Sequence, residues 1–226
     1  MGPGSRAADG GETLGGGVES PDVRRASDPA AFADGGQAVA RLLARAFRDN
    51  PMNRAVLRRS PDARVRANQL GARMLLRVAE TSGHVLVAEA GTGAGMGGPV
   101  GALIGFEPFR PPAPSAALAQ ALLLLRQGLR AALRWGAVQA ELASIRPDDP
   151  HWTLAMVGVD PDRQGSGIGA GLVARWVDGI AAVPAPAWVE TDRLELVPFY
   201  QRFGFEPEAR CTVHGVEVAG LRRPEP

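Results

Sequence analysis

Apolar residues in the first part of the chain recur at helical spacing. From Gln37 onward they fall three and four residues apart, which is the spacing of one helix face, up to a boundary at Asn50-Pro51. Ser60-Pro61-Asp62 is a typical helix start, and the pattern that follows it continues to Gly83. These two stretches predict two amphipathic helices.

Short apolar runs bounded by glycine and proline predict strands. Residues 84–90 and 100–106 are two such runs, and the glycine-rich stretch 91–98 between them predicts a hairpin. Residues 22–27 are expected to form a short first strand. Residues 151–159 are apolar almost throughout, which is typical of a central strand that is buried on both faces.

The rest of the chain alternates between the two kinds of pattern. The expected segments are a helix over 115–135 that continues to Ile145, a helix from the glycine-rich stretch 165–169 to Ile180, a strand over 187–191, a short helix over 198–203 closed by Gly204, and a final hairpin that turns near His214-Gly215. No internal repeat interrupts this order. The sequence therefore predicts an α/β fold.

The first 21 residues differ in composition from the rest. Residues 1–20 hold seven glycines and only two large apolar side chains, Leu14 and Val18. So little apolar surface cannot offset the entropy that ordering would cost. We expect residues 1–21 to be a disordered tail and residues 22–226 to be a single domain.

Composition also excludes several functions. The 226 residues carry a net charge of +1, which argues against a partner such as nucleic acid. All 25 basic residues are arginine, so Schiff-base chemistry and the lysine of a P-loop are excluded. The single cysteine, Cys211, excludes an intrachain disulfide and a cysteine-based zinc site. Because no apolar run is long enough to span a bilayer and no apolar leader is present, we expect a cytoplasmic protein without a membrane partner.

The segment from Val157 to Gly169 carries the strongest chemical signal. Here an apolar strand runs into a glycine-spaced loop that opens a helix. Residues without side chains let backbone N–H groups approach phosphate oxygens, and the N-terminus of the helix favours negative charge. A dinucleotide-binding fold is a competing interpretation, since Gly165-x-Gly167-x-x-Ala170 and Glu190 fit its fingerprint. Too few residues follow Ala170, however, to add the parallel strands that such a fold needs.

A third interpretation fits more of the sequence. Gln164-Gly-Ser-Gly-Ile-Gly169 resembles the Q/R-x-x-G-x-G/A pyrophosphate loop of the GCN5-related N-acetyltransferase (GNAT) superfamily. Val189-Glu-Thr191 and Phe199-Tyr-x-x-x-Gly-Phe205 resemble the fifth strand and the Phe-Tyr-x-x-x-Gly-Phe signature of that superfamily. The resemblance is strong over residues 151–206 and extends in element order over residues 22–145. Residues 152–173 and 198–205 look closest to the puromycin N-acetyltransferase type.

The resemblance implies a fold and an activity. The fold is a central mixed, mostly antiparallel twisted sheet, flanked by helices, with a splay between its fourth and fifth strands. The activity is transfer of an acetyl group from acetyl-CoA, without a metal, to a primary amine, with a small molecule as the preferred acceptor. Two alternatives stay open: a catalytically weak acetyl-CoA sensor, and a protein acetyltransferase acting on lysine or on N-termini. The sequence leaves a monomer and a homodimer both open.

The resemblance also implies roles for individual residues. Tyr200 would act as general acid toward the departing CoA thiolate. Glu190, beside the splay, is the first candidate for the general base, and Glu107 is the second. The residues expected to bind acetyl-CoA are Val157, Gly158, Val159, Arg163, Gln164, Gly165, Ser166, Gly167, Ile168, Gly169 and Ala170.

Three positions depart from the pattern of the superfamily. Gln164 stands where arginine is commoner, and Ser166 stands where a basic residue is frequent. Leu196 replaces an asparagine that often precedes the tyrosine helix. We expect Arg163 to supply charge near the loop, and one hydrogen bond to CoA to be missing.

Overall fold

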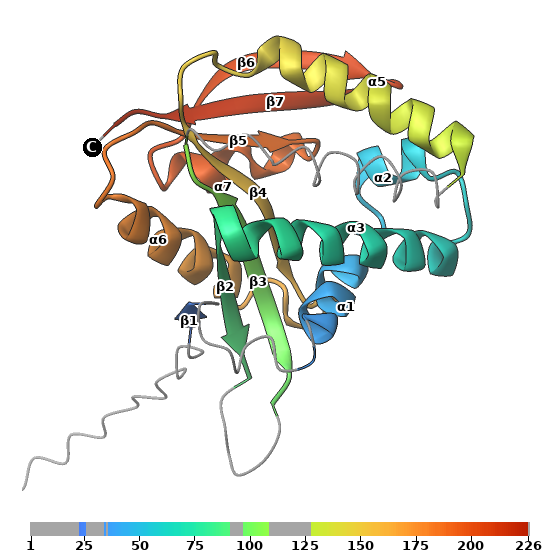
Figure 1. Ribbon diagram of the computed structural model, residues 1–226, viewed down its shortest axis with the longest axis horizontal. Helices are drawn as coiled ribbons and strands as arrows, with labels where there is room; N and C mark the ends of the chain where they lie inside the picture. Colours follow the sequence, from blue (N-terminus) through green and yellow to red (C-terminus); the bar gives the residue numbers. More distant parts are fainter. Residues whose placement is uncertain (1–22, 26–33, 35, 91–96, 109–127, 226) are drawn as a thin grey trace, which may run out of the picture.

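The computed structural model describes residues 23–25, 34, 36–90, 97–108 and 128–225. Within these residues a seven-stranded sheet has the order β1-β2-β3-β4-β5-β7-β6 (Figure 1). All neighbouring strands are antiparallel except β4 and β5, which are parallel. The mixed, mostly antiparallel sheet flanked by helices confirms the predicted fold class.

The elements follow one another as helices, strands and short turns. The strands are β1 (Val23–Arg25), β2 (Gly83–Glu89), β3 (Pro99–Phe106), β4 (Trp152–Val159), β5 (Ala187–Thr191), β6 (Glu206–Val213) and β7 (Val216–Arg223). The helices are α1 (Gln37–Ala46), α2 (Pro51–Val56), α3 (Pro61–Ser82), α5 (Leu129–Ile145), α6 (Ile168–Ile180) and α7 (Val197–Gln201), with 3₁₀ turns η2 (Pro161–Arg163) and η3 (Leu194–Leu196). Across the described part of the chain, no helix has the length and apolar character needed to cross a membrane.

Most elements lie where the sequence pattern placed them, and β5 has the predicted bounds. The pattern missed α2, since its six residues are too few to show a helical period. Pro51 occupies the first turn of α2, so the proline that was predicted to end a helix begins one instead, and α1 already ends at Ala46. The tail predicted over 1–21, most of the turn predicted over 91–98 and residues 115–127 of the predicted helix lie outside the described residues.

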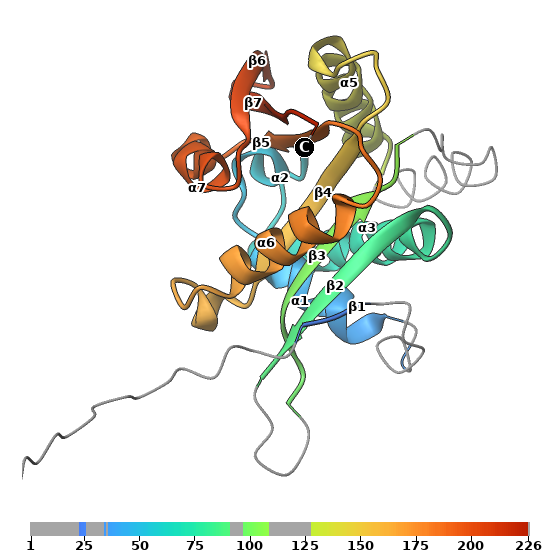
Figure 2. The same cartoon turned by 90° about the vertical axis from the view of Figure 1, so that its left-hand side faces the viewer.

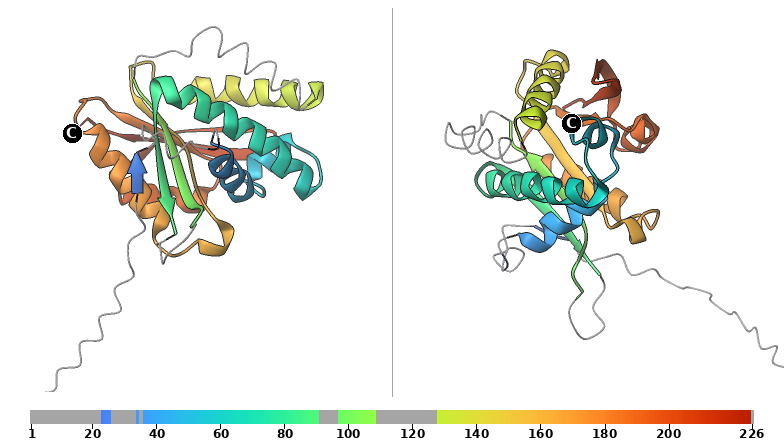
Figure 3. Two further views of the ribbon diagram at one scale, coloured as in Figure 1. Left: turned by 60° about the horizontal axis from the view of Figure 1, so that its bottom comes forward. Right: turned by 90° about the vertical axis from the view of Figure 1, so that its right-hand side faces the viewer.

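Helices cover both faces of the sheet (Figure 2). On one face, α6 packs Leu172 and Trp176 against β3 and β4. On the other face, Leu43 of α1 and Leu76 of α3 pack against Ile104 of β3. The helices α2, α3 and α5 are arranged around the far end of this second face (Figure 3).

The parallel strands β4 and β5 separate after three residue pairs, the last of which is Leu154 with Val189. Beyond it, β4 stays paired with β3 and β5 stays paired with β7. Ala155 has no partner in the register with β3 and is the extra residue of a bulge at this point. The predicted splay is thereby confirmed, and it leaves one edge of β4 open.

The splay also corrects one prediction. Residues 151–159 were expected to be buried on both faces, yet Ala155 is exposed and Met156 and Val157 are half-buried. The physical reason is that β5 no longer covers this part of β4. A strand that is uniformly apolar in sequence therefore contributes an open edge and part of a cavity wall.

Candidate active site

The predicted anion-binding loop lies between the end of β4 and the first turn of α6. Gly165 and Gly167 have φ angles of 80° and 85°, which side chains of L residues rarely adopt. A Cβ atom at either glycine would meet nothing within 4 Å, so the space beside the loop is open. The first N–H groups of α6 have no partner within the helix and lie at this opening. The loop has the geometry of a phosphate cradle.

Side-chain hydrogen bonds hold the loop in this shape. The Nε2 group of Gln164 donates to the carbonyl oxygen of Val159 at 3.3 Å. The hydroxyl of Ser166 donates to the carbonyl oxygen of Arg163 at 2.6 Å. Gln164 and Ser166, the two departures from the family pattern within the loop, therefore bond to backbone carbonyls of this segment. The side chain of Arg163 is left exposed beside it.

Arg45 of α1 brings a positive charge to the same loop. One of its terminal nitrogens lies 3.2 Å from a carboxylate oxygen of Asp160 and 3.2 Å from one of Asp162. These contacts offset two negative charges that would otherwise oppose an anion at the glycine loop. They also tie α1 to the segment that follows β4.

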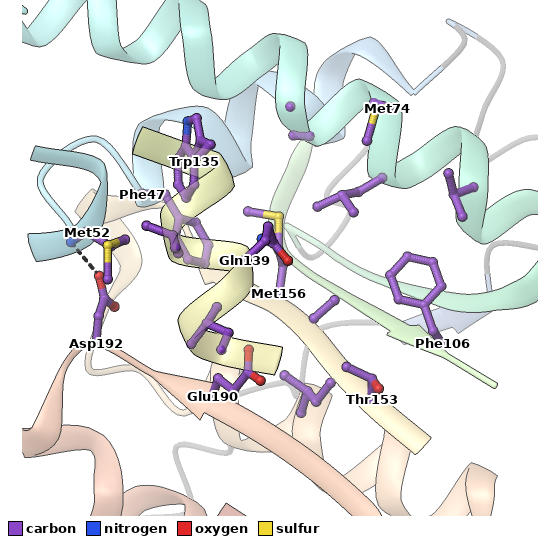
Figure 4. A pocket seen from close by; sticks show the side chains of 18 of the residues that line it. Phe47, Met52, Met74, Phe106, Trp135, Gln139, Thr153, Met156, Glu190 and Asp192 are labelled. Atoms are coloured by element: carbon purple, nitrogen blue, oxygen red, sulfur yellow. Dashed lines mark hydrogen bonds between the residues drawn. The ribbon is translucent and has the colours of Figure 1, made fainter. Parts of the chain in front are cut away.

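A cavity of about 680 Å³ opens on the second face, between the helices α1, α2, α3 and α5 and the ends of β3, β4 and β5 (Figure 4). This volume lies in the range of small-molecule sites. Its labelled apolar lining residues are Phe47, Met52, Met74, Phe106, Trp135 and Met156. Three of the five methionines in the chain are among them, and methionine side chains adapt to ligands of different shape.

Glu190 lies on the cavity wall and is already paired. The Nε and Nη2 atoms of Arg146 lie 2.5 and 2.8 Å from its two carboxylate oxygens, and the indole N–H of Trp188 donates to one of them at 3.0 Å. Only 15% of the Glu190 side chain is exposed. Its role as general base stays a prediction. A carboxylate that a guanidinium already holds in this way gains less from a second cation.

Asp192, which follows β5 directly, was not singled out by the sequence. Its two carboxylate oxygens accept hydrogen bonds from the backbone N–H of Met52 at 2.7 Å and from the side-chain amide of Asn50 at 3.1 Å (Figure 4). Burial raises the pKa of Asp192, and these two bonds oppose that rise. Both partners belong to the start of α2, so the contact joins segments far apart in sequence. The one signal in the sequence is an acidic side chain at the end of a strand.

Tyr200 lies on α7, with 4% of its surface exposed. Its ring packs edge-on against Phe199 and Phe205, at centroid distances of 5.1 and 6.2 Å. Burial and the nearby charge of Asp192 raise the pKa of the Tyr200 hydroxyl, and Arg193 opposes that rise. Tyr200 is therefore protonated at neutral pH, as a general acid must be, while its ring also belongs to the core.

The structure distributes the remaining predicted residues around the splay. Val157, Gly158 and Val159 lie on the stretch of β4 that has no β5 partner. Glu107 lines the cavity at the end of β3. Leu196 lies in the turn before α7, where its side chain offers no hydrogen bond.

Comparisons with known proteins agree with this geometry. Residues 131–207 match the family model of the acetyltransferase (GNAT) domain. Among solved structures, the chain is similar to a histone acetyltransferase HPA2 and related acetyltransferase from Corynebacterium glutamicum, at 20% identity over 92% of this chain and 97% of that one, with a TM-score of 0.64. It is also similar to arylalkylamine N-acetyltransferase 2 from Aedes aegypti, at 12% identity over 90% and 99% of the two chains, with a TM-score of 0.64. At these levels of sequence identity, the two structures support the fold of this chain and say nothing of its acceptor.

The matched segment includes β4, the glycine loop, α6, β5 and Tyr200, which together form the splay and its surroundings. The finer resemblance to the puromycin type stays a prediction. The family match, the strand order and the splay lead to one conclusion: residues 131–207 carry a GNAT acetyltransferase domain match, and the chain around them has the fold of acetyltransferases.

Proposed function

We propose that the protein transfers the acetyl group of acetyl-CoA to the primary amine of a small molecule. The observation that carries this proposal is the splay between β4 and β5, with the glycine loop beside it and the cavity reaching it from the second face. A thioester at the open edge of β4 and an amine in the cavity would approach each other through this gap.

The chain offers two sets of groups to acetyl-CoA, which supplies the activated acetyl group. On the edge of β4 turned away from β3, the backbone of Val157, Gly158 and Val159 would pair with an extended arm, as an added strand would, with the Val159 carbonyl already accepting from Gln164. The N–H groups of residues 164–170 would bind the pyrophosphate. Arg163 would contribute positive charge near the loop, and Arg45 offsets the negative charges of Asp160 and Asp162.

Two further groups would act on the reaction itself. A backbone N–H on the open edge of β4 would stabilise the oxyanion that forms as the amine attacks. Tyr200 would donate its proton to the departing thiolate, which neutralises the negative charge that develops on sulfur as the C–S bond breaks. A carboxylate on the cavity wall would take the proton of the amine. The sequence supplies Glu190 for this role, and the structure adds Asp192 on the same wall as a further candidate.

The cavity supports a small acceptor over a protein segment. Its apolar wall comes from the helices and strands on several sides, and its volume suits a molecule of moderate size. One structural neighbour is named for arylalkylamines and another for histones, so both kinds of acceptor belong in the test.

The test is a thiol-release assay with acetyl-CoA across four acceptor types: an arylalkylamine, a polyamine, a peptide with a free N-terminus and a lysine peptide. We expect a small amine to give the fastest release, with the acetylated product identified by mass spectrometry. Faster acetylation of a peptide would favour the protein acetyltransferase. Binding of acetyl-CoA without release on any acceptor would favour the sensor.

A further inference from the structure

Asp192 is a carboxylate that lines the acceptor cavity and whose charge acts on the predicted general acid. We propose that Asp192 receives the ammonium group of the acceptor and takes its proton, while the cavity beside it holds an apolar body. The acceptor class is therefore a primary amine on an apolar skeleton. The catalytic half of this proposal rests on the function proposed above.

The position of Asp192 supports this role. It follows the last residue of β5, at the open end of the splay, and its side chain lines the cavity. Its negative charge acts on the hydroxyl of Tyr200, so the two groups lie near each other. A base on the amine and an acid on the sulfur have to flank the same carbonyl carbon, and the charge of Asp192 reaches the one tyrosine that could be that acid.

The hydrogen bonds of Asp192 leave room for a cation. Its two partners, the Met52 amide and the Asn50 side chain, are both neutral. Among the described residues, no arginine forms an ion pair with Asp192, whereas Glu190 is held in a two-point pair by Arg146. Each carboxylate oxygen of Asp192 has a further lone pair, so an ammonium can add to the existing bonds.

The charged groups around Asp192 leave its carboxylate available. Arg193, its neighbour in sequence, lowers the pKa of Asp192 through its charge, but its guanidinium donates to Glu195 at 2.9 Å and forms no ion pair with Asp192. Arg54 of α2 is exposed, and Glu190 of β5 is paired with Arg146. Tyr200 of α7 is neutral at working pH. Burial raises the pKa of Asp192, which makes the carboxylate a better proton acceptor than an exposed aspartate.

The cavity wall determines the rest of the acceptor. Phe47, Met52, Trp135 and Met156 present apolar surface on several sides (Figure 4). Polar side chains such as Asn68 and Gln139 also line the cavity, but apolar ones outnumber them. A molecule covered with charged or hydroxyl groups would therefore lose more hydration there than these partners replace. Glu107 lines the cavity next to Phe106, which Figure 4 shows well apart from Asp192, so one ammonium near Asp192 and an apolar body beyond it fit the lining.

Every proton that moves in this step has a donor and an acceptor. The ammonium gives one proton to Asp192, which passes it to solvent, and the free amine then forms the N–C bond as the C–S bond breaks. The nitrogen gives its second proton to Asp192, again for release to solvent. Tyr200 gives one proton to the sulfur and recovers one from solvent. The amide and free thiol form with one proton released overall.

The first experiment measures binding without turnover. Calorimetry compares 2-phenylethylamine, 2-phenylethanol and spermidine on the full chain saturated with CoA. We expect the amine to bind at least about 10-fold tighter than the alcohol, because only the amine can pair with a carboxylate, and tighter than spermidine. Asp192→Asn should abolish the preference for the amine over the alcohol, and Glu190→Gln should preserve it. Tighter binding of spermidine, or loss of the preference in Glu190→Gln alone, would overturn the proposal.

The second experiment measures kcat/KM against pH with the same amine. Asp192→Asn, which keeps the size of the side chain, should lower kcat by about 10²-fold or more and remove the acidic limb of the profile. Asn50→Ala removes a neutral partner but keeps the carboxylate, so its acidic limb should remain. Wild-type kcat and an unchanged limb in Asp192→Asn would contradict the base role. If Asp192→Asn does not fold, loss of the limb in Asn50→Ala would contradict it instead.

These two readouts separate the inference from the proposed function. If acetyl transfer fails with every amine while the Asp192-dependent binding preference persists, acetyl transfer is the wrong function and the recognition site stands. If transfer succeeds and the binding preference does not depend on Asp192, acetyl transfer is the right function and Asp192 is not the recognition site.

Discussion

The two sides of the splay are built in different ways. The cofactor side comes from one continuous stretch, from Val157 at the end of β4 through the glycine loop to Ala170. The acceptor side is assembled from the end of α1, from α2, α3 and α5, and from four strands, β3, β4, β5 and β7. We propose that the continuous loop binds a cofactor that many acetyltransferases share, whereas an assembled wall can change residue by residue. The contrast predicts that variants on the two sides will separate binding of acetyl-CoA from selection of the amine.

The largest expected effect lies between the two sides, at Tyr200. Tyr200→Phe removes one hydroxyl and keeps the ring that packs against Phe199 and Phe205. Because the thiolate would lose its proton donor, kcat should fall by about 10²- to 10⁴-fold, with acetyl-CoA affinity unchanged. Single-turnover kinetics measure this even where product release limits the steady state. A rate within a few-fold of wild type would assign the proton to water or to another group.

A bulkier residue at Gly71 tests the acceptor side by itself. Gly71 lies on α3 and lines the cavity, and a Cβ atom there would meet nothing within 4 Å. Gly71→Leu should fill part of the cavity and raise the KM of the amine by about 10-fold, with no change in acetyl-CoA affinity. Gly136→Leu is the matched control, since Gly136 is an exposed glycine of α5 with the same free space. Equal KM values for the two variants would place the acceptor elsewhere.

Alkaline titration tests the environment of Tyr200 through stability. A tyrosine in the unfolded chain titrates near pH 10, and the raised pKa of Tyr200 keeps the native hydroxyl protonated above that. Its contribution is therefore fully present below pH 10 and is lost as the pH rises toward the native pKa. From pH 10 to 11, wild type should lose about 1 kcal/mol more than Tyr200→Phe in urea unfolding.

The composition of the chain removes most other groups that titrate in this pH range. It has one tyrosine and no lysine, and Cys211→Ser in both proteins removes the remaining thiol. Parallel loss of stability in the two proteins would mean that the hydroxyl is solvated in the native state.

The smallest expected effect is removal of residues 1–21. Their composition offers little apolar surface, so deletion should change the melting temperature by less than about 2 °C and leave turnover unchanged. A loss of several degrees, followed by calorimetry, would show that these residues pack against the domain.

The same contrast explains how much the sequence could predict. The glycine loop and β5 were predictable because neighbouring residues carry the signal, through Gly165, Gly167 and the run from Ala187 to Thr191. The open edge of β4 was predictable only through family resemblance, since its apolar pattern alone indicates burial. Asp192 was not predictable, because the start of α2 reaches it across 140 positions of sequence. Local patterns predict elements and loops, whereas a cavity wall depends on packing between distant segments.

The central claim is that acetyl-CoA binds at the glycine loop. Gly167→Glu puts an anion, on a residue with a φ angle of 85°, where the pyrophosphate is expected. Gly167→Ala tests the backbone strain alone, which costs about 1–2 kcal/mol. Calorimetry should show acetyl-CoA affinity lowered by at least about 100-fold in folded Gly167→Glu and by much less in Gly167→Ala. Unchanged affinity in folded Gly167→Glu would contradict the account and move the cofactor away from this loop.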